Sequence, residues 1–521
     1  MKTKLLLFAL LIIASISMSQ AQIAGIANGD GTAANPYQIG TPNELIAFKT
    51  AVNTAAGTGA AAANYVLTAN INMTNSGDFS GIGNATNVFA GNFNGKGFKI
   101  SGLTLGSAGS PFAGGVDYNT GFFGFIATAT ISNLWVDVAY YVSSETSLVY
   151  TATICGGLVG TVTTGNAVIN NCKVTGTIFS ESTAASAAAG RAITGGLVGA
   201  ANALNIANST LIIINSTVNA TLSSKTSMAT SGSAICAGIV GHVWNSSGLI
   251  VNIVNCSADG SVSTTANSSG SFAGGIASTI TSANNGIVKI YNCLAKNTIS
   301  STGVSTPTAY NQLAASGIGH MFNAANEIKN CMLLNPTISL YTTSTAMTYG
   351  LDRVFTGTTV TPINIDNNYA KADMTLQLAV SGGAYAPYVL TPANIVKEGR
   401  DGADLGSDAV GEATTKLNAY ITTTPKFPDA NGIALKTWIA GALTEGVTSV
   451  KQFELKPINY SIDNGILKVN GIVGSKQLRI YSVSGAIYKQ LTVTDSYSTL
   501  LAKGIYMLKV EDFAPSKLVV Y

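Results

Sequence analysis

Small or apolar residues alternate with polar residues in short stretches that recur along most of the chain. Residues 172–178 and 256–262 are two examples, in which every second side chain is small or apolar. This alternation is typical of a β-strand that buries one face. Gly, Asn, Thr, Ser and β-branched residues dominate these stretches, and all of them are poor helix formers. The pattern therefore predicts a chain built from strands and turns.

A four-residue phrase precedes these strands and recurs every 37 to 44 residues. It consists of an aliphatic residue, a variable residue, an Asn and a small or apolar residue. The seven Asn residues, the last in a looser copy of the phrase, are Asn133, Asn171, Asn215, Asn255, Asn292, Asn330 and Asn368. A period of this size indicates stacked supersecondary units. Because Asn tolerates left-handed backbone geometry and stacked amides bond to one another, we expect these residues to form a structural ladder at a coil corner.

A glycine-rich phrase alternates with the Asn phrase. It reads Gly-Gly-Leu-Val-Gly at 156–160 and 195–199, with variants at 121–124, 237–241, 274–277 and 316–319. Apolar residues on every repeat are buried most simply when each repeat winds into one coil and the coils stack about 4.8 Å apart. We therefore predict an all-β fold: a right-handed parallel β-helix (solenoid) with helical caps, whose hand follows that of parallel crossovers.

The first residues predict an export signal. Residues 1–21 combine Lys2 and Lys4 with an apolar run and small residues before position 22, which is typical of a signal peptide. A membrane anchor is the alternative, but the apolar run is shorter than the roughly 20 residues that a span needs. No other segment is apolar and long enough to cross a bilayer, so we expect no transmembrane segment after signal removal.

With the signal peptide, the sequence predicts five parts in all. Residues 22–110 form an amino-terminal cap with a short helix after Thr41, followed by the first coils. Residues 111–375 are the β-helix repeats. Residues 376–445 form a carboxy-terminal cap, with helices at 415–423 and 434–439, and the start of a connector. Residues 446–521 contain short strands separated by turns, which predicts a small antiparallel β-sandwich.

Composition and cysteine positions fit an exported solenoid. The chain is 10% charged and 46% hydrophobic, and its formal net charge of +3 comes without a basic patch, which argues against nucleic acid as a partner. The six Cys occupy equivalent positions: Cys172, Cys256, Cys293 and Cys331 follow the Asn, and Cys155 and Cys236 precede the Gly phrase. We interpret them as small buried side chains. A disulfide between neighbouring coils, such as Cys256 with Cys293, is the alternative.

Candidate chemistry along the chain is sparse. Parallel β-helices include polysaccharide lyases and pectin hydrolases, whose reactions need paired carboxylates or a basic residue with metal-holding carboxylates. Charged residues between 110 and 370 are scattered, and Glu327 with Lys329 reads as a solvated surface pair. His242 and His320 lie a whole coil apart, which favours turn or edge positions over a metal site. We predict no catalytic, cofactor or metal residues and no bound cofactor.

One acidic stretch keeps a metal alternative open. It comprises Glu398, Asp401, Asp404, Asp408 and Glu412. Loop oxygens of this kind bind Ca²⁺, but the stretch lacks the fixed spacing of known Ca²⁺ loops. A solvated cap loop is therefore the favoured interpretation.

The ordered recurrence of the two phrases resembles the GLUG motifs of large bacterial surface proteins. The segments 35–39, 65–67 and 89–100 resemble the amino-terminal section that accompanies such repeats, so the resemblance covers about residues 30 to 375. It implies a surface protein.

The last segment resembles the carboxy-terminal sorting domain of the type IX secretion system of Bacteroidetes. The resemblance rests on residues 478–485, 501–510 and 517–520. The Pro-Asn-Pro common near the start of such domains is absent, and only Lys456-Pro457-Ile458-Asn459 stands there. The resemblance implies that the type IX machinery is a partner, with export across the outer membrane, removal of this domain and attachment to the cell surface.

Two functions remain as hypotheses. The leading one is a secreted, non-enzymatic cell-surface protein, an adhesin or glycan-binding or structural protein, whose Thr-, Ser- and Asn-rich faces contact surface or host glycans. The rival is a carbohydrate-active enzyme, a lyase or hydrolase, on a β-helix scaffold. A carboxylate or basic cluster on neighbouring coils would favour the rival.

Overall fold

The computed structural model describes residues 22–520 apart from short gaps. These lie at 55–58, 116–117, 146–151, 184–189, 202–208, 228–231, 245–247, 268–269, 281–286, 304–311, 321–325, 344–347, 357–363, 389–409, 429–431, 440, 444–458, 471, 473–474, 483–486 and 511–515. The chain divides into two compact units between Gly446 and Val447. The predicted signal peptide lies outside the described residues.

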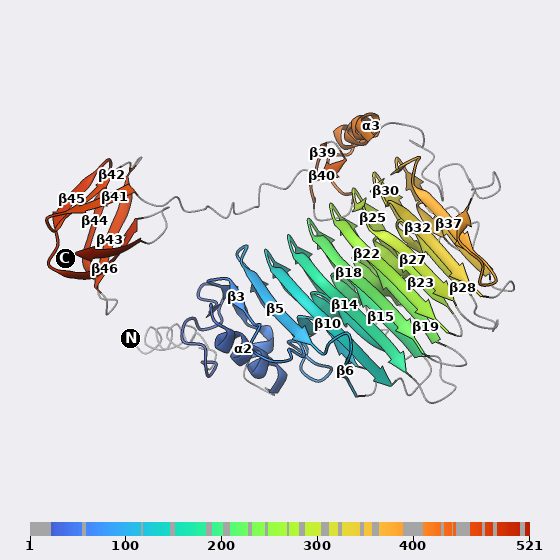
Figure 1. The fold of residues 1–521 in the computed structure, drawn as a ribbon, viewed down its shortest axis with the longest axis horizontal. Helices are drawn as coiled ribbons and strands as arrows, with labels where there is room; N and C mark the ends of the chain where they lie inside the picture. The colour runs from blue at the N-terminus through green and yellow to red at the C-terminus, as the bar shows by residue number, and fades with distance from the viewer. Residues whose placement is uncertain are drawn as a thin grey trace, which may run out of the picture. The chain divides into compact units, whose positions relative to one another are not determined.

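The first unit is a parallel β-solenoid of about six turns, which confirms the predicted parallel β-helix (Figure 1). Each repeat contributes one strand to each of several parallel sheets, and the same sheets recur from coil to coil. A ten-stranded sheet contains β1 (Tyr37–Ile39), β2 (Asn64–Leu67), β4 (Asn92–Asn94), β9 (Thr130–Ser132), β13 (Asn166–Asn170), β17 (Thr210–Ile214), β21 (Ile250–Val254), β25 (Ile287–Tyr291), β30 (Glu327–Lys329) and β35 (Asn364–Asp366).

A fourteen-stranded sheet has the longest strands. Its main path contains β3 (Ile71–Asn72), β5 (Lys99–Leu105), β10 (Trp135–Glu145), β14 (Lys173–Thr183), β18 (Thr217–Thr226), β22 (Ser257–Ala266), β27 (Thr298–Gly303), β32 (Thr337–Thr342), β37 (Thr375–Ala379) and β38 (Ala386–Pro387). Beside this path lie β6 (Phe112–Ala113), β26 (Leu294–Ala295), β31 (Met332–Leu333) and β36 (Tyr369–Ala370). Figure 1 shows its long arrows side by side along the solenoid.

Two further parallel sheets meet at the glycine-rich phrases. One contains β7 (Asn119–Thr120), β11 (Ala152–Gly156), β15 (Gly190–Gly195), β19 (Gly232–Ala237), β23 (Ser271–Gly274), β28 (Gln312–Ser316) and β33 (Thr348–Asp352). The other contains β8 (Phe123–Ile126), β12 (Val159–Val162), β16 (Val198–Ala201), β20 (Val240–Val243) and β24 (Ala277–Ile280), and β29 (Gly319–His320) pairs with β34 (Phe355–Thr356). A Cβ on Gly196 would lie 2.0 Å from the carbonyl oxygen of Gly238, so the coils approach too closely there for any other residue.

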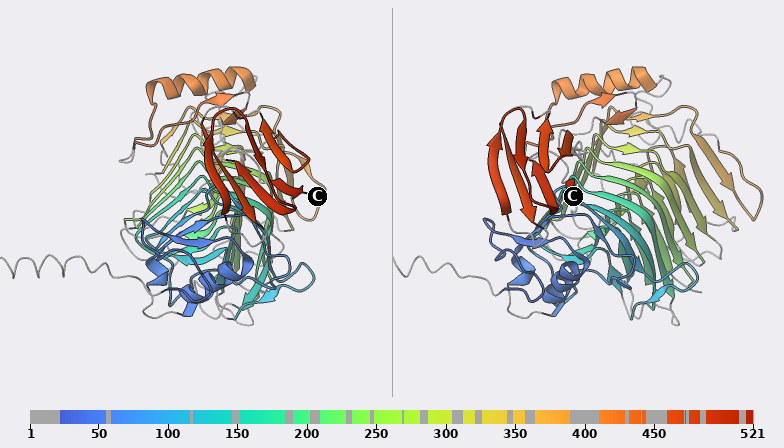
Figure 2. Two further views of the ribbon diagram at one scale, coloured as in Figure 1. Left: turned by 90° about the vertical axis from the view of Figure 1, so that its left-hand side faces the viewer. Right: turned by 60° about the vertical axis from the view of Figure 1, so that its left-hand side comes forward.

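The core of the solenoid is apolar throughout. Leu197 and Ile239, from two Gly phrases, are fully buried, and inward residues of every described coil join them in one cluster. This burial follows from the alternation in the sequence, because successive side chains on a strand point to opposite faces. The left view in Figure 2 looks toward the amino-terminal end of the solenoid, so that the coils lie one behind another.

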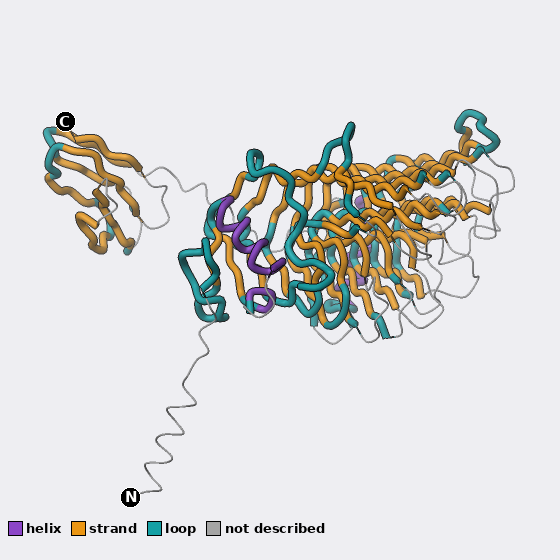
Figure 3. The backbone as a smooth tube through the Cα atoms, turned by 90° about the horizontal axis from the view of Figure 1, so that it is seen from below, coloured by secondary structure: helices purple, strands orange, loops and turns teal. Residues whose placement is uncertain are grey.

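A helix closes the amino-terminal end, as predicted. Helix α2 (Pro42–Thr54) begins after Thr41, whose hydroxyl accepts the amide hydrogen of Glu44, while Glu44 accepts from the amide of Gly40. This pairing is a variant of the capping box, because the Glu44 carboxylate accepts from the residue before Thr41 instead of from Thr41 itself. Phe48 is fully buried with its ring centroid 3.9 Å from that of Tyr65, so the helix packs into the mouth of the first coils (Figure 3). A short 3-10 turn, η1 (Ala60–Ala62), follows.

The helix predicted at 415–423 is confirmed, but its place on the solenoid differs from the prediction. Helix α3 (Val410–Thr423) packs through Leu417 against Tyr291, Met332 and Tyr369 of successive coils, so it covers a flank of the solenoid instead of its end. Figure 1 shows α3 alongside the coils. The antiparallel strand β38 pairs with β37 on the last coil.

The prediction of a second helix at 434–439 is wrong. This segment is extended, with β39 (Trp438–Ile439) antiparallel to β40 (Ala442–Leu443). The side-chain amide of Asn418 donates to the carbonyl of Trp438 and accepts from its backbone N–H. These contacts outweigh the local helical pattern.

The second unit is a small antiparallel sandwich, as predicted. One sheet contains β41 (Asn459–Asp463), β42 (Ile466–Asn470) and β45 (Tyr497–Leu500), and the other contains β44 (Ile487–Val493), β43 (Lys476–Ser482), β46 (Gly504–Val510) and β47 (Ser516–Val520). Leu467 from the first sheet and Leu478 and Leu508 from the second share one buried core. Among the described residues of the chain, no helix has the length and apolar character that a bilayer crossing requires.

Candidate functional site

Six of the seven predicted ladder residues lie in one row. Asn133, Asn171, Asn215, Asn255, Asn292 and Asn330 all have left-handed φ between 52° and 56°. Each donates its side-chain amide to an Asn oxygen of the preceding coil at 2.8–3.2 Å. The first rung, Asn94, was missed by the sequence analysis. Asn215 departs slightly from the row, because it donates to Asn170 instead of Asn171.

The seventh predicted position is a correction. Asn367, with φ 54°, donates to Asn330 at 2.6 Å and is the last rung. Asn368 points inward, fully buried in the slot that Cys331 occupies one coil earlier, and accepts the amide hydrogen of Cys331 at 2.9 Å. The last phrase therefore begins at Ile365, one residue before the position that the loose sequence match suggested.

Part of the ladder holds another segment of the chain. We call residues 432–439 the strap. Asn255 donates to the carbonyl of Ala434 at 2.9 Å and accepts the amide of Lys436 at 3.0 Å, while Asn292 donates to the carbonyl of Lys436 at 2.8 Å. Asn255 and Asn292 are buried. Here the side chains of the ladder attach the backbone of the strap to the coils. Neither Asn255 nor Asn292 has an exposed polar group for a ligand.

The six cysteines are buried free thiols. Burial raises the pKa of Cys172 to about 12, against a smaller opposing effect of hydrogen bonds with the backbone. A thiol with so high a pKa is protonated at neutral pH and is a poor nucleophile. The cysteines therefore pack as small apolar side chains.

The two histidines are buried in strands, which contradicts the turn or edge positions expected for them. His242 lies on β20, and its ring is edge-on to that of Trp244 with the ring centroids 4.7 Å apart. His320 lies on β29, where its Nδ1 is 2.8 Å from the hydroxyl oxygen of Thr356. Burial follows because both residues continue the Gly phrases, whose strands pack on both faces.

The structure holds little that resembles a metal centre in the residues it describes. Those residues contain no group of three or more His, Cys, Asp or Glu side chains arranged to hold a metal ion. Of the acidic stretch, positions 398–408 lie outside the described residues. Glu412 lies on α3, where it pairs with Lys416 at 3.5 Å.

Glu327 lies in an ionic cluster that the sequence analysis read as a solvated pair. Its carboxylate is 3.1 Å from Lys289 and 3.3 Å from Lys329, accepts a hydrogen bond from the hydroxyl of Tyr291, and is only 17% exposed. Desolvation alone would raise the pKa of Glu327, but the hydrogen bonds from Tyr291 and Lys289 and the charges of the two lysines outweigh it and lower that pKa. The carboxylate is therefore ionised at neutral pH.

The outward face of the fourteen-stranded sheet carries the most varied exposed chemistry. Lys99, Trp135 and Lys173 lie in register on β5, β10 and β14, and we call them the indole row. Each lysine Nζ is 4.4 Å from the centroid of the Trp135 ring, which is cation–π distance.

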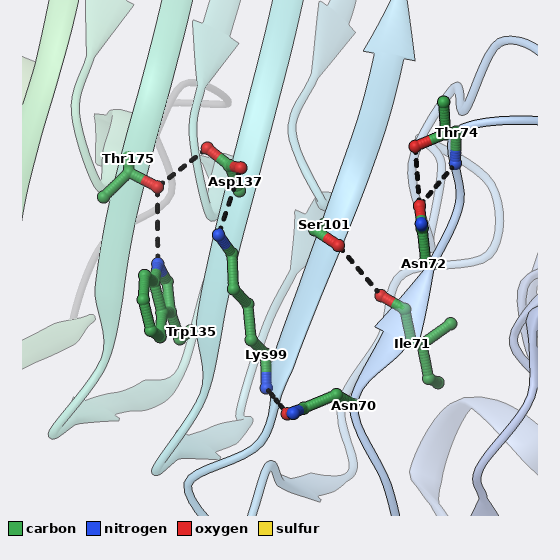
Figure 4. A network of polar contacts seen from close by, with 9 residues as sticks. All are labelled: Asn70, Ile71, Asn72, Thr74, Lys99, Ser101, Trp135, Asp137 and Thr175. Atoms are coloured by element: carbon green, nitrogen blue, oxygen red, sulfur yellow. Dashed lines mark hydrogen bonds and ion pairs between the residues drawn. The ribbon is translucent and has the colours of Figure 1, made fainter.

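A second row of this face orients the indole. Trp135 Nε1 donates to the hydroxyl of Thr175 at 3.3 Å, and Thr175 donates to Asp137 at 2.8 Å (Figure 4). Asp137 also pairs with Lys99 at 3.2 Å. The indole is thus fixed by a hydrogen-bonded chain that ends on a carboxylate.

Farther along the same strands the face is aromatic and then rich in hydroxyls. Tyr141 and Phe179, outward on β10 and β14, have ring centroids 6.3 Å apart. One column in register contains a hydroxyl on each of six coils, namely Thr177, Thr221, Ser261, Thr298, Thr337 and Thr375. Residue-by-residue reading missed this face, because Lys99, Trp135 and Lys173 are 36 and 38 positions apart in the sequence. Aligning the repeats would have placed them in one row.

No model of a known protein family matches this chain, and neither does any curated protein.

Proposed function

We propose that this is a secreted, cell-surface β-helix protein that binds glycans through the outward face of the fourteen-stranded sheet. The observation that carries the proposal is the composition of that face. It combines aromatic rings, a lysine pair, carboxylates and a column of hydroxyls on one regular surface.

Sugars fit such a surface for elementary reasons. A pyranose ring has apolar C–H patches that pack on aromatic rings such as Tyr141 and Phe179. Its hydroxyls both donate and accept hydrogen bonds, as do the Thr and Ser side chains of the column. The repeat of about 4.8 Å between coils offers the same groups again and again to a polymer.

The rival function, a carbohydrate-active enzyme, is favoured by one observation. The Glu327 cluster is a charged group on neighbouring coils, the feature that would distinguish such an enzyme. Its chemistry supports the rival weakly. The cluster has one carboxylate, held ionised, so it offers no acid and base pair. Tyr291 is 1% exposed, and its ring packs against Phe427 with centroids 4.9 Å apart. We therefore interpret the cluster as an attachment between the coils and their covering segment.

A glycan array with residues 22–521, which include the second unit, tests the proposal, together with an assay for sugar release in the same samples. The proposal predicts binding without release of sugar at enzyme rates. Tyr141→Ser with Phe179→Ser should weaken binding. The matched control is Tyr488→Ser, which removes another exposed aromatic ring, 51% exposed, from the second unit. Equal effects of the two variants, or rapid sugar release by the wild type, would overturn it.

We also propose that the second unit directs export by the type IX secretion machinery and is then removed. This rests on the resemblance of residues 478–485 and 501–510 to sorting domains. The separate core of the second unit is compatible with such a role, because it lets the unit fold independently of the solenoid.

A further inference from the structure

We propose that the indole row is a binding subsite for an anionic group, and that the glycan recognised by this face is therefore acidic. The inference rests on the proposed function and specifies its ligand class. The shared chemistry is a carboxylate or sulfate ester displayed along a polysaccharide, as in a polyuronate or a sulfated glycan.

The charge balance of the row favours an anionic ligand. Lys99 and Lys173 contact one indole from the strands on either side of it, so their nitrogens are at most twice 4.4 Å apart. Asp137 is the carboxylate that pairs with Lys99. The row and the neighbouring Asp137 thus hold two ammonium groups and one carboxylate, which leaves a local excess of one positive charge. Such a site is electrostatically complementary to one further anion.

The two lysine side chains are preorganised for binding. A lysine side chain in water loses substantial rotamer freedom when it binds a ligand. The Trp135 ring already holds both ammonium groups in place, and the hydrogen bond to Thr175 fixes the ring itself. An anion that bridges these groups pays less ordering entropy than it would at two unrestrained lysines.

The indole row is accessible to solvent and lies close to the hydroxyl column. The side chain of Lys99 is 30% exposed and that of Asp137 is 38% exposed, while Lys173 is among the exposed residues of β14. A ligand can therefore reach the row from solvent. The column that begins at Thr177 starts on the same strand two outward positions farther on, so one polymer can contact both.

The Glu327 cluster provides a contrast within the same protein. There too a lysine lies over an aromatic ring, because Lys329 Nζ is 5.7 Å from the centroid of the Tyr291 ring. Both lysines of that cluster pair with the same Glu327 carboxylate, and each is only 18% exposed. Its inner position leaves little room for a ligand, so the exposed indole row is the better anion site.

The experiment uses the mature full chain and measures affinity by calorimetry for three probes. These are oligogalacturonate, a neutral galactan oligomer of the same length, and a sulfated dextran. The inference predicts tighter binding of the anionic probes than of the neutral one. It also predicts that added salt weakens the binding of the anionic probes more than the binding of the neutral probe, because salt screens exposed charges.

Three variants locate the effect. Lys173→Met removes the charge but keeps an apolar chain over the indole, and should lower affinity for the anionic probes about fivefold while sparing the neutral probe. Lys173→Arg should retain most of the affinity. The matched control Lys426→Met removes one exposed positive charge outside the fourteen-stranded sheet and should change nothing. Far-UV circular dichroism checks that each variant is folded.

The outcomes separate the two proposals. Binding of the neutral probe as tightly as the anionic ones, or equal effects of Lys173→Met and Lys426→Met, would overturn the anion site but leave glycan binding intact. Failure of all glycans to bind the wild type would overturn both. Preference for the sulfated probe over oligogalacturonate would support the site and identify sulfate as the anion.

Discussion

Replacement of Asn292 should reveal how strongly the ladder holds the solenoid together. Its side chain is fully buried and makes three hydrogen bonds of 2.8 Å: it donates to Asn255 and to the carbonyl of Lys436, and accepts from Asn330. Its φ of 55° is left-handed. Asn292→Ala removes the bonds and imposes unfavourable backbone geometry on an Ala, whereas Asn292→Gly removes the bonds but accepts that geometry.

The magnitude follows from these contacts. Each lost bond that leaves a buried partner unsatisfied costs about 1 kcal/mol, so Asn292→Gly should lower the free energy of unfolding by about 3 kcal/mol. The left-handed conformation adds about 1–2 kcal/mol for Ala, so Asn292→Ala should cost about 4–5 kcal/mol. Asn133→Gly is the matched control. Asn133 has only ladder bonds and is partly exposed, so water replaces its partners and the cost should be about 1 kcal/mol.

Urea unfolding followed by far-UV circular dichroism measures these differences. Because repeat proteins do not always unfold in one step, the slope with urea should be compared among variants before free energies are derived. If Asn292→Gly were as stable as the wild type, the ladder would contribute nothing. If the Ala and Gly variants were equally stable, left-handed geometry would not be what selects Asn at this corner.

Four further predictions concern the core, the thiols, the ionic cluster and delivery. Leu197→Asp or Ile239→Asp should cost several kcal/mol and lower the melting temperature, because each carboxylate would be buried without a partner, and unchanged melting would show that the Gly phrases do not face the core. Thiol titration should find all six Cys free after denaturation and none reactive in the native protein, Cys172 included; a count near zero after denaturation would indicate disulfides. Since the folded pKa of Glu327 is lowered, its stabilisation should be complete above the ordinary value of 4.5 and be lost as pH falls through the folded pKa, so Glu327→Gln should lower stability at neutral pH and flatten the acid side of the pH profile; an unchanged profile would contradict this. Deletion of residues 447–521 should leave a folded solenoid in the periplasm, and surface display of the truncated chain at normal levels would reject the sorting role.

The fold was predictable because its main determinants are local and repeated. Alternation in stretches such as residues 172–178 predicts strands, and the recurring Asn predicts corners, since few other residues accept left-handed geometry. The amino-terminal helix was predictable because Thr41 and Glu44 form a cap within four residues of sequence. The strap was not, because its contacts with Asn255 join residues about 180 positions apart.

The candidate site was largely beyond the sequence analysis for a similar reason. The indole row joins residues from three coils, and no single stretch of sequence contains it. The Glu327 cluster was underestimated because Lys289 and Tyr291 come from the preceding coil, and because burial under a covering segment depends on where that segment folds. The prediction of the last ladder residue was wrong by one position. Asn367 and Asn368 are adjacent, and only packing distinguishes the coil corner from the inward position.

Hydroxyl-radical footprinting of residues 22–521, with and without a bound glycan, tests the central claim most directly. The method reports the solvent accessibility of individual aromatic side chains. We predict that a bound glycan protects Trp135, Tyr141 and Phe179 on the outward face of the fourteen-stranded sheet and leaves Tyr488 of the second unit unprotected. Protection confined to residues around the Glu327 cluster, with Trp135 as accessible as before, would contradict the account and favour the rival hypothesis of an enzyme.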